Sequence, residues 1–332
     1  MSEGFVTLAE IETARAAIGE TVRRTFVNGS PSLTEMAGVP VHLKLEHQQI
    51  TGSFKLRGAS NAIAQLTDAE KARGVVGVST GNHGRGLAHA ARAAGVRCII
   101  CMSKLVPQAK IDGIMAQGAE VRIVGRSQDE AQEEVDRLVA EEGMTMIPPF
   151  DHRAIIAGQG TLGLELVEQV PDLGTVLVPL SGGGLICGVA AAVKAKKPDA
   201  KIVGISMERG AAMHACLQAG RPVAVEELPT LADSLGGGIG LDNRHTFAMT
   251  RALVDDVVLL DEAEIARAIR HAYWQERQIV EGSGAVGIGA LLAGKVNSSG
   301  PVVAVLSGGN IAMDQHARIV AGEDVDVARE AA

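Results

Sequence analysis

The sequence predicts an α/β fold built from parallel strands and covering helices. Short runs of β-branched and aliphatic residues alternate with helical patterns from Val75 to Val305, and this alternation is typical of parallel sheets. The composition agrees, because 40 glycines against five Phe, one Tyr and one Trp suit tight turns packed with small aliphatic side chains. With 46% apolar residues in 332, the chain can bury one large core or two moderate ones.

The first elements are a strand at 41–46 and a helix that follows a glycine-containing turn. Residues 41–46 alternate apolar and polar side chains, which is typical of a half-buried strand. Ser53 stands where a helix N-cap is expected. Beyond it, apolar residues recur at the spacing of an amphipathic helix, at Ala59, Ala62, Ile63 and Leu66.

Lys55 opens this helix and is the first candidate for chemistry. A lysine that is partly desolvated beside the positive end of a helix has its ammonium form disfavoured. The neutral amine is the form that attacks a carbonyl, so this position suits a lysine that forms a Schiff base. Position alone leaves a second interpretation open, which is a solvated first-turn lysine.

The next elements lie between about 74 and 149. Strands are predicted at 75–79, 96–102, 120–124 and 144–147, with helices at 83–94 and 128–142 between them. Cys98 and Cys101 fall in one of these strands, and their odd separation places the two side chains on opposite faces. We interpret them as buried thiols of a reducing compartment rather than as a metal or redox pair.

Three further glycine-rich turns each follow an apolar strand. They are Ser79–Gly84 after 75–78, Ser181–Leu185 after 176–180, and Ser307–Asn310 after 302–306. Consecutive glycine N–H groups at the start of a helix form an anion pocket, and in Ser181–Leu185 this pocket suits a phosphate.

Two nucleotide-binding motifs match by spacing but fail on context. Gly289–Val296 has the spacing of a Walker A loop, yet Val296 replaces the Ser or Thr that binds magnesium. A G-x-G-x-x-G pattern follows a helical run rather than a strand, and no acidic residue lies about 20 positions further on. Its glycines are Gly282, Gly284 and Gly287.

Four motifs stand in one order along the chain, and together they carry a resemblance. They are Ser53–Lys55, Ser79–Gly84, Ser181–Leu185 and Ser307–Asn310. In this order they resemble the fold-type II pyridoxal-phosphate enzymes, and within these the threonine/serine dehydratase branch, which also contains serine racemase. The similarity runs from about Leu8 to about Val320, so it covers nearly all of the chain.

The resemblance implies the tryptophan synthase β-like fold, with two three-layer domains that each contain a parallel sheet. We expect a large cofactor-binding domain made of residues 1–73 and 150–332, with a small domain of residues 74–149 inserted into it. The regulatory domain that long threonine dehydratases carry at the C-terminus is not expected here. A homodimer is implied by the relatives alone.

The resemblance also assigns roles around pyridoxal 5′-phosphate as the cofactor. Lys55 would hold the cofactor as a Schiff base and remove the substrate α-proton, and Phe54 would pack beside it. The 5′-phosphate would be bound by Ser181, Gly182, Gly183, Gly184 and Leu185. The substrate α-carboxylate would be held by Ser79, Thr80, Gly81, Asn82 and His83, and Asn82 would also bond the cofactor 3′-oxygen. For His83, a helix-start residue without a chemical role is the other interpretation.

Two side chains indicate the type of reaction under this resemblance. Thr80 stands where serine racemases carry a second base on the opposite face, but a threonine methyl hampers that role, so elimination is favoured. Ser307 would bond the pyridine nitrogen, and a neutral hydroxyl leaves that nitrogen unprotonated. The weaker electron sink favours loss of a β-hydroxyl over transamination. A simple turn serine is the alternative interpretation of Ser307.

Within that branch, the chain is similar to the hydroxyectoine-utilisation dehydratases. The segments that carry this likeness are 147–152, 207–213 and 231–243. We therefore expect a dehydratase that releases a 2-oxo acid and ammonia from a β-hydroxy-α-amino acid, with a substrate derived from hydroxyectoine. Specificity for the distal end of the substrate is expected from 149–152 and 236–243, where Asp151 and His152 could meet an amine or amide, or simply serve the loop surface.

Several alternatives stay open. Related chemistry would be serine or threonine racemisation or 3-hydroxyaspartate dehydration, and a different class would be a non-catalytic amino-acid-binding protein on the same fold. Glu208 matches the first ligand of a divalent-cation site in some relatives, but the expected second acid is missing, so no metal is expected. Glu281 stands where relatives place an acid near the cofactor ring, or is a surface helix end.

Charge and the lengths of the apolar runs argue against nucleic acid and membrane as partners. A net charge of −8 and a pI near 5.6, without a basic stripe, argue against nucleic acid. No apolar stretch reaches the roughly 18 residues of a membrane span, and the N-terminus has no basic start or apolar signal core. We expect a cytoplasmic protein that acts on a small amino-acid substrate.

Overall fold

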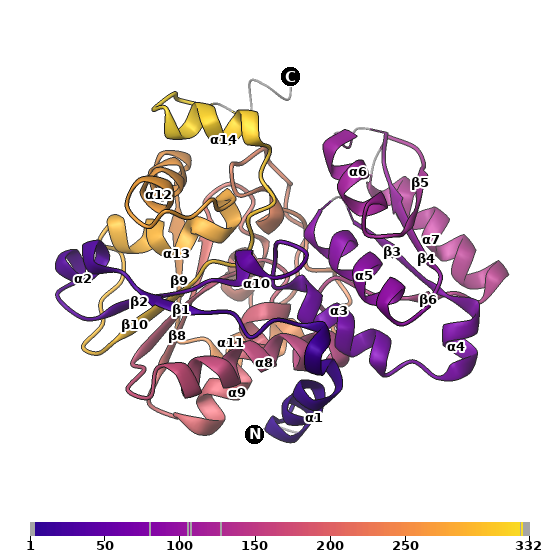
Figure 1. The fold of residues 1–332 in the computed structure, drawn as a ribbon, viewed down its shortest axis with the longest axis horizontal. Coiled ribbons are helices and arrows are strands. Elements are labelled where there is room, and N and C mark those ends of the chain that lie inside the picture. The colour runs from indigo at the N-terminus through magenta and orange to yellow at the C-terminus, as the bar shows by residue number, and fades with distance from the viewer. Residues whose placement is uncertain are drawn as a thin grey trace.

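Two α/β lobes, each built around its own sheet, make up the computed structural model (Figure 1). The structure describes residues 4–79, 81–104, 106, 108–126, 128–325 and 327. Thr80, one of the residues to which the sequence assigned a role, lies outside the described residues.

The larger lobe contains a six-stranded sheet in the order β1-β2-β10-β7-β8-β9. Its strands are β1 (Val27–Gly29), β2 (Val41–Lys44), β7 (Thr175–Pro179), β8 (Lys201–Met207), β9 (Asp256–Leu260) and β10 (Val302–Val305). All of these strands pair in parallel except β1, which runs antiparallel to β2 at the edge of the sheet. The sequence predicted only parallel pairing, because a three-residue edge strand leaves too short a pattern to show its direction.

Helices cover both faces of this sheet, as the continuous burial of strands such as β7 and β10 requires. Val176 and Val178 pack into one hydrophobic cluster and Leu177 into the other. The first face carries α1 (Leu8–Ile18), α8 (Arg153–Gln169), α9 (Gly184–Lys196), α10 (Ala212–Ala219) and α11 (Thr246–Leu253). The second carries α2 (Pro31–Ala37), α12 (Glu262–Trp274), α13 (Gly282–Leu292) and α14 (Met313–Val320).

The smaller lobe contains a parallel sheet in the order β5-β4-β3-β6. Its strands are β3 (Val75–Val78), β4 (Cys98–Met102), β5 (Glu120–Ile123) and β6 (Thr145–Met146). The helices around it are α4 (Asp68–Arg73), α5 (Asn82–Ala93), α6 (Gln108–Met115) and α7 (Gln128–Glu142). A further helix, α3 (Lys55–Ala64), packs against both α5 and α8 and so joins the two lobes.

These elements confirm the secondary structure that the sequence predicted for this stretch, with ends that differ by one or two residues. Cys98 packs into the hydrophobic cluster on the α5 side of the sheet, whereas Cys101 packs into the cluster on the α7 side. Both are free, buried thiols on opposite faces, as predicted. The two glycine patterns that resemble nucleotide-binding motifs start within the buried helix α13. Neither forms the loop after a strand that such a motif requires, which agrees with the rejection of both.

The predicted N-cap at Ser53 is wrong. Helix α3 begins at Lys55, and Phe54 occupies the cap position without a side-chain hydrogen bond. Ser53 is fully buried and forms an antiparallel bridge with Gly308, while the Phe54 N–H donates to the Ser307 carbonyl at 3.0 Å. Tertiary pairing has therefore taken the residue that local propensity would assign to the cap.

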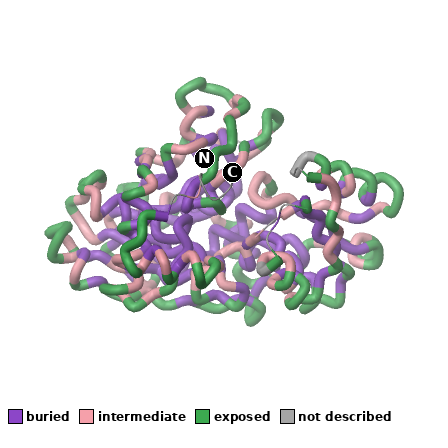
Figure 2. The backbone as a smooth tube through the Cα atoms, turned by 90° about the horizontal axis from the view of Figure 1, so that it is seen from above, coloured by how far each residue is buried: buried purple, intermediate pink, exposed green. Residues whose placement is uncertain are grey.

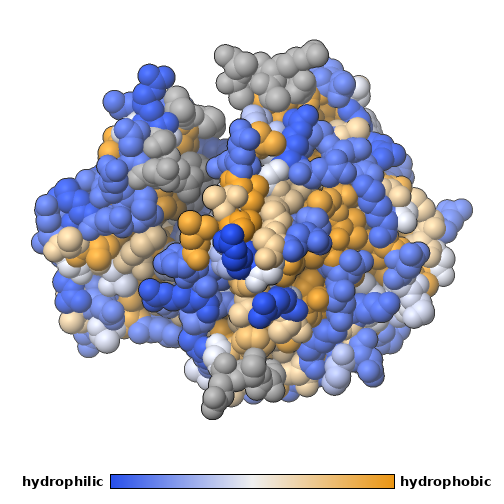
Figure 3. Space-filling model, turned by 180° about the vertical axis from the view of Figure 1, so that it is seen from behind, coloured by the Kyte–Doolittle hydropathy of each residue, from blue (hydrophilic) through white to orange (hydrophobic). Residues whose placement is uncertain are grey.

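Burial follows the two lobes, with buried segments concentrated inside each and exposed segments around the rim (Figure 2). On the opposite face from Figure 1, apolar side chains gather in a band near the middle of the view, flanked by hydrophilic ones (Figure 3). Among the described residues, no helix is both long and apolar enough to cross a membrane.

Candidate functional site

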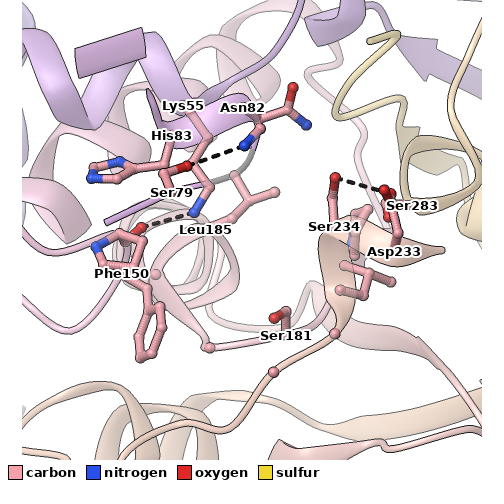
Figure 4. Close-up of a pocket in the computed structure, with 18 of the residues that line it drawn as sticks. Lys55, Ser79, Asn82, His83, Phe150, Ser181, Leu185, Asp233, Ser234 and Ser283 are labelled. Atoms are coloured by element: carbon pink, nitrogen blue, oxygen red, sulfur yellow. Dashed lines mark hydrogen bonds between the residues drawn. The ribbon is translucent and has the colours of Figure 1, made fainter. Parts of the chain in front are cut away.

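A cavity of ≈ 350 Å³ lies between the two lobes, at the carboxyl ends of their parallel strands. This is the edge at which α/β sheets bind ligands. Figure 4 shows Lys55, Ser79 and His83 on one side of it, with Asp233 and Ser234 opposite and Ser181 below. The structure thus brings together residues that are up to about 250 positions apart in the chain.

Lys55 enters the cavity from the first turn of α3. Its Nζ donates to the Pro149 carbonyl at 2.8 Å and stands 5.4 Å from the centre of the Phe54 ring. Burial lowers the pKa of the Lys55 amine to about 8, and no carboxylate among the described residues pairs with the ammonium form. A substantial share of this amine is therefore neutral near pH 8, as a nucleophile or base requires.

The turn after β3 presents backbone N–H groups to the same cavity. The Ser79 hydroxyl accepts from the N–H of Gly84 at 2.9 Å and of Gly81 at 3.3 Å, which fixes the turn at the start of α5. No acceptor within the described part of the chain takes the N–H of Asn82 or His83. Two unpaired donors at a helix N-terminus suit a carboxylate.

His83 has a structural bond as well as a place in the cavity wall. Its Nε2 lies 2.9 Å from the Ile147 carbonyl, so this nitrogen must carry the proton. Burial, with the Lys55 ammonium nearby, lowers the pKa of His83 to about 3. The ring is neutral at ordinary pH, and its side chain links α5 to the chain beyond β6.

Asn82 belongs to a buried amide–carboxylate network that spans the two lobes. Its Nδ2 donates to Glu281 Oε1 at 2.7 Å, and its Oδ1 accepts from Asn310 Nδ2 at 2.6 Å. The Asn310 N–H donates to the other Glu281 oxygen at 3.1 Å. Burial, together with the nearby Asp233 carboxylate, raises the pKa of Glu281 to about 7. Glu281 is buried in the cavity wall rather than exposed at a helix end.

The Ser181–Leu185 turn forms a cradle at the N-terminus of α9. Gly183 has φ +90°, and a Cβ on Gly182 would lie 2.4 Å from the Phe150 ring. Both positions therefore need glycine. Within the described residues, no group accepts the N–H of Gly182, Gly184 or Leu185. Unpaired donors at a helix N-terminus fit a phosphate group.

Two buried serines complete the wall next to this cradle. The hydroxyl of Ser307 has one distant contact, 3.5 Å to the Ser283 carbonyl, and the Ser283 hydroxyl has no partner among the described residues. Buried hydroxyls without partners are rare in folded proteins. Pyridoxal 5′-phosphate requires an amine for its aldehyde, a partner for its ring nitrogen and donors for its phosphate. The Lys55 amine, the buried serine hydroxyls and the free N–H groups fit these three needs.

The mouth of the cavity contains charged residues that sequence reasoning missed. Lys110 of α6 and Asp233 of the short helix η3 (Asp233–Leu235) form an ion pair of 2.7 Å that joins the two lobes. Glu227 and Ser234 also line the cavity. Asp233 and Ser234 belong to the segment 231–243 that carried the subgroup likeness, which was a usable signal. Lys110 and Glu227 carried no sequence signal, since they lie in stretches without a motif.

Asp151 and His152 are not in the cavity, contrary to one of the two interpretations of the sequence. The Asp151 carboxylate accepts from the N–H groups of Arg244, His245 and Thr246, at 2.6 to 2.9 Å, and so caps α11. His152 Nδ1 accepts from the Ala154 N–H and caps α8. Both residues hold the loops around the site. Their neighbours Pro149 and Phe150 do line it.

Glu208 lies on the protein surface at the end of β8. Its N–H donates to the Leu260 carbonyl at 2.9 Å. In the part of the chain that the structure describes, no group of three or more His, Cys, Asp or Glu residues gathers as a metal site would require.

Known proteins resemble this chain over nearly its whole length. The family model described as "Pyridoxal-phosphate dependent enzyme" matches residues 18–308. A Sinorhizobium fredii protein named "Putative threonine dehydratase" is 62% identical over 318 residues, covering 96% of each chain. A Thermotoga maritima protein named "L-threonine ammonia-lyase" is 41% identical, covering 95% of this chain and 78% of its own.

Solved structures agree with these relatives. A structure of maize serine racemase superimposes with a TM-score of 0.89 at 35% identity, covering 93% of this chain and 95% of its own. A structure of a T.th. threonine deaminase superimposes with a TM-score of 0.85 at 35% identity, covering 92% of this chain and 99% of its own.

Proposed function

The chain belongs to the family of pyridoxal-phosphate dependent enzymes, and within it we propose a dehydratase of a β-hydroxy-α-amino acid that is formed from hydroxyectoine. The chain is a lyase of the threonine dehydratase type, and pyridoxal 5′-phosphate is its cofactor. The overall reaction removes the α-proton and the β-hydroxyl, and hydrolysis of the resulting enamine gives a 2-oxo acid and ammonia.

The observation that carries this proposal is the convergence of three groups on one cavity. Lys55 supplies the amine, the Ser181–Leu185 turn supplies free N–H groups for the phosphate, and Ser307 supplies a neutral hydroxyl for the pyridine nitrogen. When bound, the cofactor takes up the negative charge that develops at the substrate α-carbon. Phe54 packs beside Lys55, and its ring limits the positions of the amine.

The remaining roles belong to the turn after β3. The N–H groups of Asn82 and His83 hold the α-carboxylate, and the Ser79 hydroxyl with Gly81 keeps the turn in shape. Asn82 Nδ2, which donates one hydrogen to Glu281, would donate its second hydrogen to the cofactor 3′-oxygen. Lys55 removes the α-proton, since the substrate α-carbon is then held beside its amine.

Hydroxyectoine as the source of the substrate is supported by the likeness of segments 147–152, 207–213 and 231–243, and by the charged residues at the cavity mouth. Asp233 is paired with Lys110, whereas Glu227 is an exposed carboxylate on the cavity wall that would meet a distal amine. Threonine and 3-hydroxyaspartate lack such a group, so the charged mouth favours a longer, amine-bearing substrate.

The test is release of ammonia and a 2-oxo acid from a substrate panel, with cofactor spectra recorded alongside. The panel holds L-threonine, L-serine, 3-hydroxyaspartate, and hydroxyectoine with its ring-opened derivatives. Turnover of a hydroxyectoine derivative with little activity on threonine or serine is the expected result. Fast turnover of threonine or serine would instead make the enzyme a general dehydratase. Lys55→Ala is the control, and it should lose both turnover and the visible absorption of bound cofactor.

Racemisation is the second candidate, because the maize protein that superimposes on this chain is named a serine racemase. Elimination is favoured by the threonine at position 80. Chiral analysis of amino acid recovered from the reaction decides between them, since a racemase returns both enantiomers and a dehydratase returns only the one supplied.

Organisation and location complete the proposal. The large domain is made of residues 1–73 and 150–332, and the small one of residues 74–149. The enzyme is a cytoplasmic homodimer, and the apolar band of Figure 3 supports self-association. Sedimentation at several concentrations tests the dimer, and a single monomeric species would contradict it.

A further inference from the structure

Two residues beyond Lys55, Arg57 lies in a buried network of four charged side chains. Arg57 is 1% exposed, Lys44 and Glu46 are fully buried, and Glu165 is 7% exposed. None of the four lines the cavity, and the proposed reaction uses none of them. Burying four charges is costly unless every one is paired. We therefore ask what the network does for the neighbouring site.

Arg57 is held by two carboxylates at once, each in a fork. Its Nε and Nη2 donate to the two oxygens of Glu46, both at 2.8 Å. Its Nη1 and Nη2 donate to the two oxygens of Glu165, at 2.7 and 3.0 Å. Nη1 also donates to the Thr161 hydroxyl at 3.0 Å. Such bidentate pairs fix the orientation of the guanidinium as well as its distance.

The network connects the elements that place the cofactor partners. Lys44 ends β2 and donates to Glu165 of α8 at 2.5 Å and to the Thr25 carbonyl at 2.9 Å. Strand β2 pairs with β10, the strand that leads directly to Ser307. The forks of Arg57 thus fasten α3, which begins at Lys55, to the sheet that carries Ser307.

Helix α3 has an unusual need for such a fastening. Its N-terminus has no side-chain cap, and the backbone bond from Phe54 to Ser307 holds only the residue before the first turn. The helix also approaches α8 at backbone distance, since a Cβ on Gly158 would lie 2.7 Å from the Gly58 Cα. Arg57 lies in that first turn, directly before this contact, where it can set the rotation of the helix.

We propose that Arg57 is a positioning residue for Lys55: its two carboxylate forks fix the first turn of α3 and thereby the place of the amine in the cavity. The inference rests on the proposed function, because it concerns Lys55 as the residue that holds the cofactor. The network has no net charge, because its two cationic side chains are matched by two carboxylates. Among the described residues, the groups that face the amine itself are the Phe54 ring, the neutral His83 and the Pro149 carbonyl.

The experiment follows attachment of the cofactor rather than turnover. Protein freed of cofactor is mixed with excess pyridoxal 5′-phosphate between about pH 6 and 10, and the growth of visible absorbance is timed. Only the neutral amine attacks, so the rate rises with pH and levels off above the pKa of Lys55. Lys55→Ala supplies the background from other lysines.

The variant Arg57→Lys tests the effect of the fork geometry apart from the effect of the positive charge. The variant keeps the balance of charges but cannot form two forks. We expect the inflection in rate to stay where it is and the plateau rate to fall by about tenfold or more, because a displaced amine attacks poorly. A folded Arg57→Lys protein that attaches the cofactor at the wild-type rate would overturn the proposal.

Glu165→Gln gives a second readout that does not depend on the first variant folding. It removes the charge of one carboxylate and weakens the second fork, so the plateau rate should again fall while the inflection in rate stays where it is. The matched control is Glu168→Gln, one turn further along α8, which loses only exposed pairs with Arg15 and Arg24. A plateau rate in Glu165→Gln equal to that of the control would also overturn the proposal.

Failure of the proposed function looks different. In that case wild-type protein would show no absorbance above the Lys55→Ala background at any pH. Attachment at Lys55 in the wild type, with both variants unchanged, would reject only the role of Arg57.

Discussion

Burial acts on two ionisable groups of one cavity with different chemical results. It lowers the pKa of Lys55 to about 8, which leaves an amine that can exchange its proton near physiological pH. It lowers the pKa of His83 to about 3, which leaves a ring that stays neutral. We therefore propose that proton transfer at the substrate α-carbon is the task of Lys55, while His83 holds the turn in place through Ile147.

Glu281 should make the stability of the cofactor-free protein depend on pH. Its pKa is raised from 4.5 to about 7 in the folded state. A raised carboxyl pKa contributes stability below the unfolded value, and this contribution is lost as the pH rises through 7. The loss should amount to about 2–3 kcal/mol between pH 5 and 8. Glu281→Gln should remove this part of the dependence, as measured by urea unfolding at both values.

Glu227→Gln is the control for this prediction, because it changes an exposed carboxylate on the same cavity wall. It should keep the wild-type dependence. The prediction fails if Glu281→Gln loses as much stability between about pH 5 and 8 as the wild type and Glu227→Gln do. Glu281 would then not titrate between these pH values.

Asp151 should matter for stability and not for substrate choice. Asp151→Ala removes the acceptor of three backbone N–H groups at the start of α11, which should cost about 1–2 kcal/mol in free energy of unfolding. Relative rates over the substrate panel should be unchanged. Asp172→Ala, which removes an exposed carboxylate between α8 and β7, is the control and should alter neither quantity. A changed substrate preference in Asp151→Ala would show that this residue does contact the substrate.

At the scale of the elements, the sequence predicted most of the strands and helices around the site but not how they meet. The strands and glycine turns are local patterns, so Lys55, Ser181 and Ser307 could be singled out from the sequence. The start of α3 could not, because the bridge from Ser53 to Gly308 joins residues more than 250 positions apart. The roles of Asp151 and Lys110 likewise depend on partners distant in the chain.

The cradle turn offers a direct test of close packing. In Gly182→Ala the new methyl group would lie 2.4 Å from the Phe150 ring, so either the ring or the turn must move. We expect the dissociation constant for the cofactor to rise by about tenfold or more, measured by absorbance titration. Gly300→Ala is the control, since its Cβ would make an ordinary 3.6 Å contact with Gly174.

The packing explanation can be separated from a general loss of flexibility. Phe150→Leu in the Gly182→Ala background removes the ring that the methyl group meets, so part of the lost affinity should return. No recovery in the double variant would mean that the methyl group acts on the turn itself.

At the scale of the whole molecule, the two lobes meet around the cavity through three kinds of contact. Helix α3 packs against helices of both lobes. The buried network of Asn82, Glu281 and Asn310 joins them beside the amine, and the Lys110–Asp233 pair joins them at the mouth. The first is made by buried helix surfaces, whereas the second depends on pH because Glu281 gains and loses its proton near pH 7. The third is partly exposed, so water and salt weaken it.

The Lys110–Asp233 pair should therefore affect substrate capture more than stability. Its side chains are 33% and 53% exposed, so the pair contributes at most about 1 kcal/mol to unfolding. Lys110→Glu places two like charges across the mouth, which should raise KM by about tenfold while the unfolding midpoint changes little. Combining it with Asp233→Lys restores opposite charges and should recover most of the lost affinity. Lys194→Glu is the matched control, because Lys194 pairs with Asp255 inside one lobe, and its KM should stay at the wild-type value. A KM in Lys110→Glu no higher than in Lys194→Glu would show that substrate enters without passing this pair.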